Sequence, residues 1–509
     1  MKGLFYLLFL FVFPVGAIAQ MDSTFGVNGR LNFDMYQCDN FPSLLFPTND
    51  NCFIIGSSDQ RNKAFLQKRK ADGTVDSAFS NGLFEVRFML GTYASFFDVV
   101  QLEDSSYLVA GNYGDAVSYC YTFMLKLNKY GVQDMQYGQA GAILIRYNSL
   151  LCAGRRLILD NEKCLITGQI YKGTSFSTNL YVTRLDLSGK IDSSFGVFGF
   201  AYNDLPDSSF YPYAFIKEDD QHYVIIGSST DNYNPAKIAF VRINKQGTYD
   251  LSFGNKGQKV FKTNEKFGAA GVLPYKGKLF LYGGIEETPN KPYSAIVCAN
   301  FDATIDKTFG VNGVDTNFNI SSTVSNVITH LSIDSKGNLF YSGTSFFDTA
   351  SFWVGRKNAD YTVDKGFGDN GFLISRSENS NGDFGNLGAL LSDGSFIVGG
   401  HCNTQNYLPL FLDIDFTFMK VKSNYLSGNN TNDCNISFFP NPCQNVLFFD
   451  NNECNGHIKL YDYLGQIVFE SEPLYGISGT IYLPSLAKGV YIVEFLTAQT
   501  KRKQKLVID

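Results

Sequence analysis

The chain alternates between short apolar runs and polar, glycine-containing turns along most of its length. One unit shows the pattern, with apolar runs at residues 99–102, 107–111, 121–128 and 142–147 separated by turns or a polar loop. Runs this short, rich in β-branched and aromatic residues, are typical of strands. No unit has room for a long helix, so the pattern predicts an all-β chain.

A short motif precedes the fourth strand of each unit, and "KIDSSFGVFGF" at residues 190–200 is a typical copy. Its aspartate can accept a hydrogen bond from its own backbone two residues on, and glycines such as Gly196 and Gly199 allow positive φ. An aromatic residue lies three positions after each aspartate, and we expect it to pack between units. The seven pairs are Asp22 with Phe25, Asp76 with Phe79, Asp134 with Tyr137, Asp192 with Phe195, Asp250 with Phe253, Asp306 with Phe309 and Asp364 with Phe367. Two copies depart from the pattern, since one carries Tyr137 and the copy "DSAFSNG" is shortened.

The motif recurs every 54 to 58 residues, and a fixed period of this size predicts a solenoid, a propeller or an array. Four short strands per unit favour one blade of a β-propeller. The marker at Asp22 has no three-strand unit before it, and the last unit, near residues 385–416, has no marker after it. We therefore expect seven blades, with the strand after Asp22 completing the same sheet as residues 411–416. A linear solenoid would need capping units instead.

The repeat resembles the delta-60 repeat, on the strength of the marker and its lead-in, as in "RLDLSGKIDSSFG". The resemblance covers about residues 22–416. It implies a bacterial surface protein with a propeller fold, and it implies no known chemistry.

The N-terminal segment has the pattern of a secretory signal peptide. Lys2 precedes a mostly apolar run at residues 4–15, and the small-x-small sequence 17–19 would be cleaved after Ala19 to leave Gln20. The run is too short for a transmembrane anchor, and no later stretch is long and apolar enough for one. We expect a secreted or outer-membrane surface protein.

The C-terminal part has a different rhythm of strands. Residues 422–435 are polar and predict a linker, and residues 436–509 predict a small β-sandwich. The tail holds Pro440-Asn441-Pro442, then "LYDYLGQIV" with Gly465, then "LPSLAKGVYIV" with Gly489 and a Lys-rich end. This order resembles the type A C-terminal sorting domain of the type IX secretion system (Por secretion tail). The resemblance implies a Bacteroidota-type bacterium, interaction with the type IX machinery, and release or surface attachment.

The expected organisation is a signal peptide (1–19), a seven-bladed propeller (20–421), a linker (422–435) and a sorting domain (436–509). The formal net charge of -6 predicts no basic surface for nucleic acid. The cysteines lie in the exported part, where disulfides are permitted. Four of them, Cys52, Cys120, Cys164 and Cys298, fall in or beside apolar strands and are interpreted as buried thiols, and a disulfide pair is expected among Cys434, Cys443 and Cys454.

No catalytic motif is visible: the chain has no H-E-x-x-H, G-x-S-x-G or P-loop sequence. Its histidines are interpreted as structural or surface residues: His222, His330, His401 and His457. One carboxylate per marker is too few for a calcium site, so no metal or cofactor is expected. The favoured hypothesis is a non-catalytic binding or adhesion module. The alternatives are a propeller hydrolase or lyase acting on polysaccharide or peptide, and a structural surface spacer.

The variable loops after the second strands predict the binding face. They should share one face of the ring with the connections from each fourth strand to the next blade, and function concentrates in such loops. The candidate aromatic residues there are Tyr119, Tyr171, Tyr211, Tyr213, Tyr233, Phe346 and Tyr407. Such rings stack on sugars or anchor proteins, so a surface glycan or a protein is the expected ligand.

Overall fold

A computed structural model describes the chain as two compact units, Met1–Tyr425 and Leu426–Asp509. The residues that it describes are 21–34, 41–59, 63–87, 93–115, 119–147, 151–171, 178–202, 209–230, 237–263, 267–288, 291–318, 325–346, 350–375, 380–405, 412–422, 436–439, 442–451, 457–462, 465–471, 478–496 and 501–509. The predicted signal peptide and most of the predicted linker lie outside these residues.

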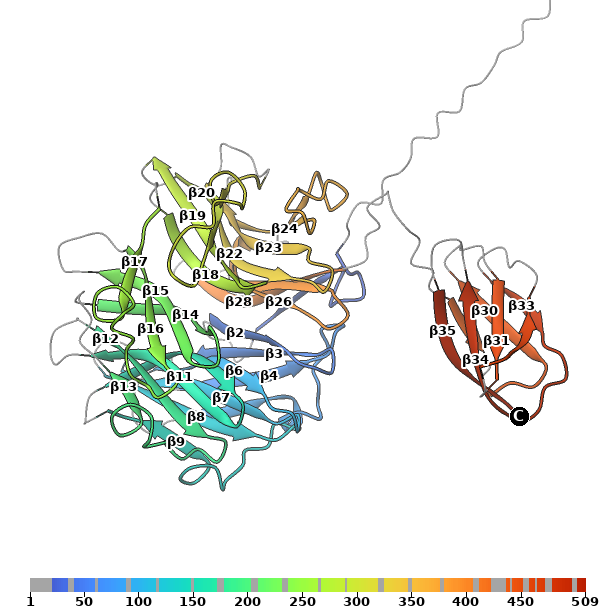
Figure 1. Cartoon of the computed structure of the whole chain (residues 1–509), viewed down its shortest axis with the longest axis horizontal. Helices are drawn as coiled ribbons and strands as arrows, with labels where there is room; N and C mark the ends of the chain where they lie inside the picture. Colours follow the sequence, from blue (N-terminus) through green and yellow to red (C-terminus); the bar gives the residue numbers. More distant parts are fainter. Residues whose placement is uncertain are drawn as a thin grey trace, which may run out of the picture. The chain divides into compact units, whose positions relative to one another are not determined.

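The first unit is a seven-bladed β-propeller, and each blade is one antiparallel four-stranded sheet (Figure 1). Blade one comprises β2 (Phe41–Pro47), β3 (Phe53–Asp59), β4 (Lys63–Arg69) and β5 (Phe84–Arg87). Blade two comprises β6 (Tyr93–Gln101), β7 (Tyr107–Asp115), β8 (Tyr119–Leu127) and β9 (Ala142–Ile145). Blade three comprises β10 (Cys152–Asp160), β11 (Lys163–Tyr171), β12 (Thr178–Asp186) and β13 (Phe200–Tyr202). Blade four comprises β14 (Ser209–Lys217), β15 (His222–Thr230), β16 (Lys237–Asn244) and β17 (Gln258–Phe261).

The remaining blades follow the same order. Blade five comprises β18 (Phe267–Tyr275), β19 (Lys278–Thr288), β20 (Lys291–Ala299) and β21 (Val314–Asp315). Blade six comprises β22 (Ser325–Ile333), β23 (Leu339–Phe346), β24 (Ala350–Lys357) and β25 (Phe372–Ser375). Blade seven comprises β26 (Ser380–Leu390), β27 (Phe396–Gln405), β28 (Leu412–Val421) and β1 (Arg30–Phe33). A single 3-10 turn, Ser80–Gly82, is the one helical element among the described residues.

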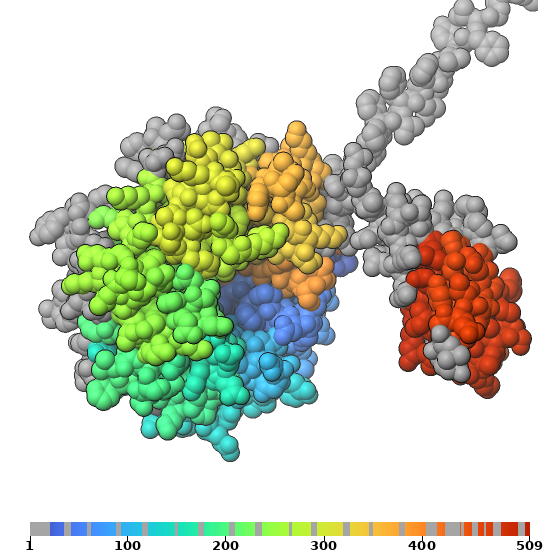
Figure 2. Space-filling model, in the orientation of Figure 1, coloured from blue at the N-terminus to red at the C-terminus, as the bar shows by residue number. Residues whose placement is uncertain are grey.

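The predicted closure of the ring is confirmed. The strand β1 pairs with β28 from Arg30↔Met419 to Phe33↔Phe416, so the N-terminal strand completes the last blade. Asp22 adds a latch, because its backbone N–H donates to the carbonyl of Lys420 (2.8 Å) and its carboxylate lies 3.3 Å from the Lys420 ammonium. The first and last blades lie side by side, as the blue and orange regions of Figure 2 show.

Seven apolar clusters fill the spaces between neighbouring blades, one cluster for each pair of neighbours. One of them joins Phe25, Phe416 and Phe418 of blade seven to Phe53 and Phe65 of blade one. A sheet with two apolar faces must bury both, and the closed ring supplies a partner for each face.

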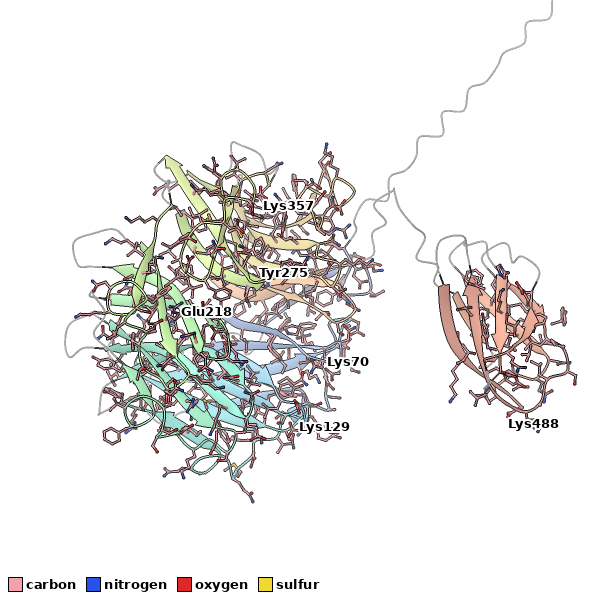
Figure 3. All side chains as sticks on the ribbon, in the orientation of Figure 1. Lys70, Lys129, Glu218, Tyr275, Lys357 and Lys488 are labelled. Carbon is pink, nitrogen blue, oxygen red and sulfur yellow. The ribbon has the colours of Figure 1, made fainter. Side chains whose placement is uncertain are left out.

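One inter-blade space also contains a buried ion pair. Lys357, which is labelled in Figure 3, belongs to blade six. Its ammonium donates to the Asp315 carboxylate of blade five and lies over the ring of Phe318, 4.3 Å from the centroid.

The repeated motif forms the corner between the third and fourth strands. In all seven corners the aspartate carbonyl accepts from the N–H of the aromatic residue, and one carboxylate oxygen accepts from the N–H two residues on. Gly196 and Gly199 have φ of 56° and 93°. The sequence therefore repeats because each blade needs the same turn.

The aromatic residue of each corner is buried between its own blade and the next. Each ring is 0% to 5% exposed and belongs to one of the seven inter-blade clusters. The seven are Phe25, Phe79, Tyr137, Phe195, Phe253, Phe309 and Phe367. A turn glycine of the following blade covers some of them, as where a Cβ on Gly131 would lie 2.9 Å from the ring of Phe79. These residues are therefore part of the framework, and their rings are not accessible to a ligand.

In six of the described corners a basic side chain neutralises the marker carboxylate. In blade three, Arg184 lies eight residues before Asp192, donates to its carboxylate at 3.0 Å and stacks over Phe195. In blade five that position is Cys298, and Lys278 from the second strand pairs with Asp306 instead, at 2.8 Å.

The second unit contains two antiparallel sheets. The three-stranded sheet has the order β29 (Ile436–Phe439), β30 (Val446–Asn451) and β33 (Ser478–Tyr482). The four-stranded sheet has the order β32 (Ile467–Glu470), β31 (His457–Tyr461), β34 (Gly489–Leu496) and β35 (Lys501–Ile508). Both sheets contribute to one apolar core. The sandwich arrangement of the two sheets stays a prediction.

Candidate binding site on the loop face

The two ends of the blades form two faces of the ring. Lys68 of β4 lies 2.6 Å from Asp50 in the turn between the first two strands and 3.8 Å from the marker Asp76, so both kinds of turn share one end, the marker face. The pairs Phe41↔Ser58 and Lys63↔Arg87 lie at the opposite end, which we call the loop face. The connections from each fourth strand to the next first strand, and from each second strand to the third, fall on the loop face.

Each first strand carries a β-bulge in the half nearest the loop face. At this bulge one residue of each first strand has no Cα partner on the second strand: Ser43, Phe97, Arg155, Tyr213, Ala270, Thr329 and Asn386. The first strand of blade seven has a second irregularity between Ser380 and Asp383. The seven first strands contact one another in sequence around the ring, so the bulges form a circle around the central channel. All seven bulge residues are partly or fully exposed. A bulge re-aims a side chain and is common next to functional sites.

The bulges explain the glycine in the middle of the second strand. A Cβ on Gly227 would lie 2.2 Å from the carbonyl oxygen of Tyr211, two residues before the bulge. Gly400 is similar, with the carbonyl oxygen of Phe384 at 1.8 Å from the added Cβ. The glycine is needed because the bulged strand pushes a carbonyl group into the space that any other side chain would occupy.

Blades three and four combine two bulge residues into an open platform. The Arg155 guanidinium lies over the Tyr211 ring at 4.3 Å, and the ring of Tyr213 is 5.8 Å from that of Tyr211. Tyr211 is 41% exposed. Burial raises the pKa of Tyr213, whose side chain bonds Ser228. We call Arg155, Tyr211 and Tyr213 the platform; it presents two aromatic faces and one positive charge.

Arg156 holds the platform in place from beneath. Its Nε donates to the carbonyl of Tyr213 at 2.6 Å, and its Nη1 donates to the carbonyl of Arg155 at 2.8 Å. One side chain therefore ties the bulge of blade three to the bulge of blade four. Arg156 also acts on Asp98 of blade two, whose carboxylate accepts from the backbone N–H of Leu157 at 2.9 Å.

Three titratable side chains lie beside the bulges. Each of the three, Asp98, Tyr282 and His330, keeps a small solvent-accessible area, but the surrounding protein desolvates its titratable group. Burial raises the pKa of Asp98 to about 6 although Arg156 and two backbone N–H groups oppose the rise. Burial also raises the pKa of Tyr282 to about 12 and lowers that of His330 to about 4. The structural role expected of His330 fits its place between Tyr282, Phe396 and the backbone of Gly388.

A second arginine–tyrosine stack lies on the loop face of blade two. The Arg146 guanidinium is 5.1 Å from the centroid of the Tyr121 ring, and Tyr121 stacks on Tyr113 with centroids 5.3 Å apart. Arg146 follows β9 directly and is exposed. We call these three residues the outer stack.

The structure brings together two of the seven predicted aromatic residues, Tyr211 and Tyr213. Tyr171 is partly buried at the end of β11. Tyr119 and Phe346 lie at strand ends on the loop face, but their side chains are outside the description, and Tyr233 and Tyr407 lie outside the described residues. Sequence reasoning missed Arg146, Arg155, Arg156 and the pair Tyr113/Tyr121. The signal for two of them was the dipeptide Arg155-Arg156 inside a first strand.

The corner residues of the repeated motif contribute nothing to this site. They lie at the marker-face end of the blades, and their aromatic rings are enclosed between sheets rather than presented to solvent. Four of these rings lie in the four clusters that separate blades one and two, four and five, five and six, and six and seven, in that order: Phe79, Phe253, Phe309 and Phe367. Arginines stack on two of the four, Arg242 on Phe253 and Arg356 on Phe367.

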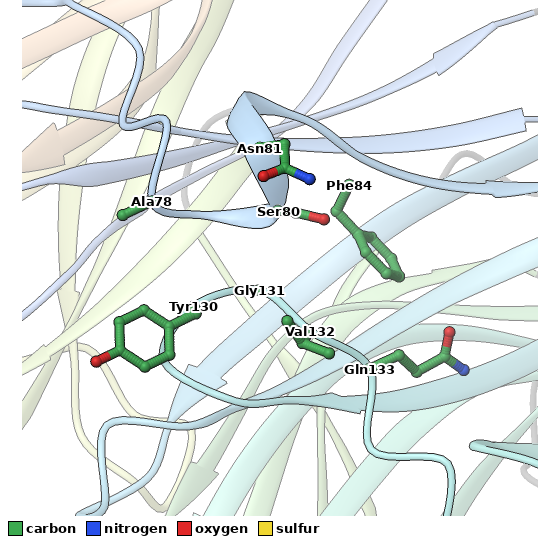
Figure 4. Close-up of a pocket in the computed structure, with 8 residues that line it drawn as sticks. All are labelled: Ala78, Ser80, Asn81, Phe84, Tyr130, Gly131, Val132 and Gln133. Carbon is green, nitrogen blue, oxygen red and sulfur yellow. The ribbon is translucent and has the colours of Figure 1, made fainter.

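Two of the hollows in the described part of the propeller lie away from this site. The shortened corner of blade one places Ser80 and Asn81 at positive φ and leaves a hollow of about 260 Å³ beside Tyr130 and Val132 (Figure 4). A larger hollow of about 360 Å³ is lined by apolar residues such as Phe267, Ile285 and Val297. The described residues that line the two hollows include no acidic or basic side chain.

The remaining predicted features have these places. In the tail, Pro442 is exposed, Gly465 has φ of 79° in a turn, and Gly489 begins β34, while Pro440 and Asn441 are not described. Cys52, Cys164, Cys298 and Cys443 are free thiols, and Cys434 and Cys454 lie outside the described residues. Among the described side chains, no three His, Cys, Asp or Glu residues gather closely enough to hold a metal ion. Within the same residues, no helix has the length and apolar character needed to cross a membrane.

Comparison with protein families identifies the C-terminal unit. Residues 437–509 match the model of the secretion system C-terminal sorting domain, the Por secretion tail. The chain therefore carries a type IX sorting domain, interacts with that export machinery, and reaches the cell surface or the medium. No curated protein matches the chain.

Several solved structures are similar to the chain. A protein of unknown function from Dyadobacter fermentans DSM 18053 is 10% identical, with a TM-score of 0.39, and the match covers 77% of this chain and 98% of that one. The propeller domain of the Trilobed protease from Pyrococcus furiosus is 9% identical, with a TM-score of 0.39 over 72% and 91%. An ulvan lyase described as a new family of polysaccharide lyase is 9% identical, with a TM-score of 0.42 over 76% and 95%. Likenesses this distant say nothing about ligand or chemistry.

Proposed function

We propose that this protein is an exported, non-catalytic binding or adhesion module that takes an extracellular ligand, a glycan above all, on the loop face of its propeller. The observation that carries the proposal is the platform, where Tyr211 is 41% exposed beneath a guanidinium at 4.3 Å. An exposed tyrosine face is a stacking surface for a sugar ring, and an adjacent arginine adds polar contacts. Tyr171, Tyr119, Phe346, Tyr233 and Tyr407 are proposed to extend this surface.

The chemistry around the platform favours binding over turnover. Both oxygens of the Asp98 carboxylate accept from backbone N–H groups, those of Val99 and Leu157. A carboxylate held in this way stabilises the bulges, and it is poorly placed to exchange a proton with a ligand.

The proposed export route combines both ends of the chain. We take residues 1–19 as a signal peptide cleaved after Ala19, residues 422–435 as a linker, and the propeller as an array of delta-60-type repeats from a Bacteroidota-type bacterium. Deleting residues 436–509 should leave the chain in the periplasm of its native host. Arrival of the truncated chain in the medium or on the surface would show that export does not need the tail.

The binding proposal is tested with the full exported chain on glycan and protein arrays. Tyr211→Ala and Tyr213→Ala should weaken the strongest binding about tenfold or more, since each removes a stacking surface. Tyr130→Ala is the matched control, because Tyr130 is 52% exposed on the marker face. Binding that survives both platform variants but is lost with the control places the site on the other face. No binding to any probe favours the structural spacer.

A second candidate function is catalysis in the channel, as in a polysaccharide hydrolase or lyase. The observation that favours it is the raised pKa of Asp98, about 6, together with Arg156, whose charge acts on both Asp98 and Tyr282. Perturbed groups that share a cleft are candidates for catalysis. The test is depolymerisation of the polymers that bind, with Asp98→Asn as the variant. Turnover that is lost with this variant replaces the binding proposal, and binding without turnover excludes this candidate.

A further inference from the structure

The propeller uses its arginines in two different ways. Two arginines in the corners of the marker face are neutralised, since Arg242 pairs with Asp250 at 2.7 Å and Arg356 pairs with Asp364. Each also lies over its corner phenylalanine. A stacked arginine with a carboxylate partner has no net charge left for a ligand.

Two arginines of the loop face, Arg155 and Arg146, are stacked but not neutralised. Within the residues that the structure describes, neither Arg155 nor Arg146 forms an ion pair, and their aromatic partners are tyrosines. The polar neighbour of Arg155 is the amide oxygen of Gln169, 3.3 Å from Nη2 and 3.4 Å from Nε. A neutral amide orients the guanidinium and leaves its charge uncompensated.

An oriented, uncompensated guanidinium matches one kind of ligand group. Its planar fork of N–H donors fits the oxygens of a carboxylate or sulfate, and such charge-assisted bonds are stronger than neutral ones. The tyrosine faces beside each arginine suit the flat, apolar side of a sugar ring. The platform therefore complements both features of an acidic sugar, its anionic group and the apolar side of its ring.

We infer that the ligand of the loop face is an acidic polysaccharide, whose carboxylate or sulfate groups bind Arg155 and Arg146. This inference rests on the proposed function and names its ligand class. The platform and the outer stack belong to consecutive blades, and the two arginines are nine residues apart in the sequence. Two sites of the same chemistry on one face suit a polymer with repeating charges better than a single sugar.

The experiment uses pairs of polysaccharide probes in which the acidic groups are free in one member and are esterified or removed in the other. Affinities of the full exported chain are measured by calorimetry for polygalacturonate and its methyl ester, and for chondroitin sulfate and its desulfated, carboxyl-esterified form. The acidic member of at least one pair should bind about tenfold tighter or more, and salt should weaken that binding. Arg155→Gln should lower the affinity for the acidic form to about the affinity for the neutral form. Arg146→Gln should have a smaller effect, because Arg146 is more exposed.

Two control variants test whether binding needs the planar guanidinium and whether the effect is specific to Arg155. Arg155→Lys keeps the charge but loses the planar fork, so its affinity should fall between those of the wild type and Arg155→Gln. Arg87→Gln removes a loop-face arginine that is 62% exposed and lies 3.9 Å from Glu85, and it should change nothing. Circular dichroism checks that each variant is folded.

The other outcomes distinguish failure of the acidic-polysaccharide inference from failure of the proposed binding function. Equal affinity for charged and neutral members, or an acidic preference untouched by Arg155→Gln, overturns the acidic ligand. If Tyr211→Ala still removes that binding, the proposed binding function stands. If no polysaccharide binds, or only a protein binds, the acidic-polysaccharide inference is wrong. If nothing binds at all, both the inference and the proposed function fail.

Discussion

The marker face and the loop face of this propeller use the same residue types for opposite purposes. On the marker face, Arg184 lies over Phe195 and pairs with Asp192, inside a corner repeated in every blade. On the loop face, Arg155 lies over Tyr211 with a neutral amide as its polar neighbour. The difference teaches that a carboxylate completes the corner stack and makes it structural, whereas the partly exposed stack of Arg155 on Tyr211 has no carboxylate partner among the described residues and is available to a ligand.

The comparison predicts its largest effect for a marker-face arginine. Arg356→Met should cost about 3–5 kcal/mol of unfolding free energy, because it leaves the buried Asp364 carboxylate without its partner. Arg155→Met leaves no carboxylate without a partner, so it should cost less than about 1 kcal/mol of unfolding free energy. Urea denaturation of both variants measures the difference, and equal losses would remove the distinction between the faces.

Acid should act on the two faces in different pH windows. The folded pKa of His330, about 4, lies below its ordinary value of 6.5. Because the unfolded chain takes up this proton first, the stability it contributes is fully present above about pH 6.5 and is lost as pH falls toward 4. The loss is about 3 kcal/mol. On the marker face the pKa of Asp192 and that of Asp306 are held at about 2 by hydrogen bonds, so their contribution is lost only as pH falls below about 3.8 toward 2.

His330→Phe isolates the upper window. Asp98 acts in the opposite sense, because its raised pKa favours the protonated fold as pH falls through 6, so the wild type alone shows the sum. In denaturation series, the variant should lose less unfolding free energy than the wild type between pH 6.5 and 4. Below pH 4 the two curves of unfolding free energy against pH should be parallel. Parallel curves throughout would mean that His330 is not responsible.

The bulged strands predict a cost at one glycine and not at another. Gly227→Ala should lose about 1–3 kcal/mol, since its Cβ would meet the Tyr211 carbonyl oxygen at 2.2 Å. It should also disturb the platform and weaken binding. Gly268→Ala is the control, because its nearest contact would be 3.9 Å away, and it should be neutral within about 0.5 kcal/mol. Thermal denaturation of both compares them, and a harmless Gly227→Ala would contradict the close approach.

The smallest effect is expected in the corners, where one position always has positive φ. Phe198 has φ of 53° there and is 82% exposed, whereas the corresponding residue of blade five is Asn312, with φ of 55°. Phe198→Asn should add about 0.5–1 kcal/mol, because Asn tolerates this conformation and no packing is lost. Asn312→Phe should lose about as much. The change in melting temperature checks the pair, and binding should be unaffected in both.

The propeller could be predicted from the sequence because each blade repeats the same local requirements. Asp192, Phe195 and the glycines after them act within a few residues, so their roles follow from spacing alone. The closure followed as well, since a marker without a unit before it and a unit without a marker after it complete each other. The pairing of Phe33 with Phe416 in the structure confirms this closure.

The site needed the tertiary structure, because it is made of residues whose partners lie one blade away. The sequence placed Tyr211 and Tyr213 among seven candidate aromatics, but it offered no reason to prefer them. Arg155 reaches Tyr211 only because two neighbouring first strands both bulge, and Arg156 binds the two bulges together. Repetition along the chain determined the fold, since every corner answers to its own sequence. Contact between blades decided the site, since a ligand meets side chains that are far apart in the chain and side by side in the ring.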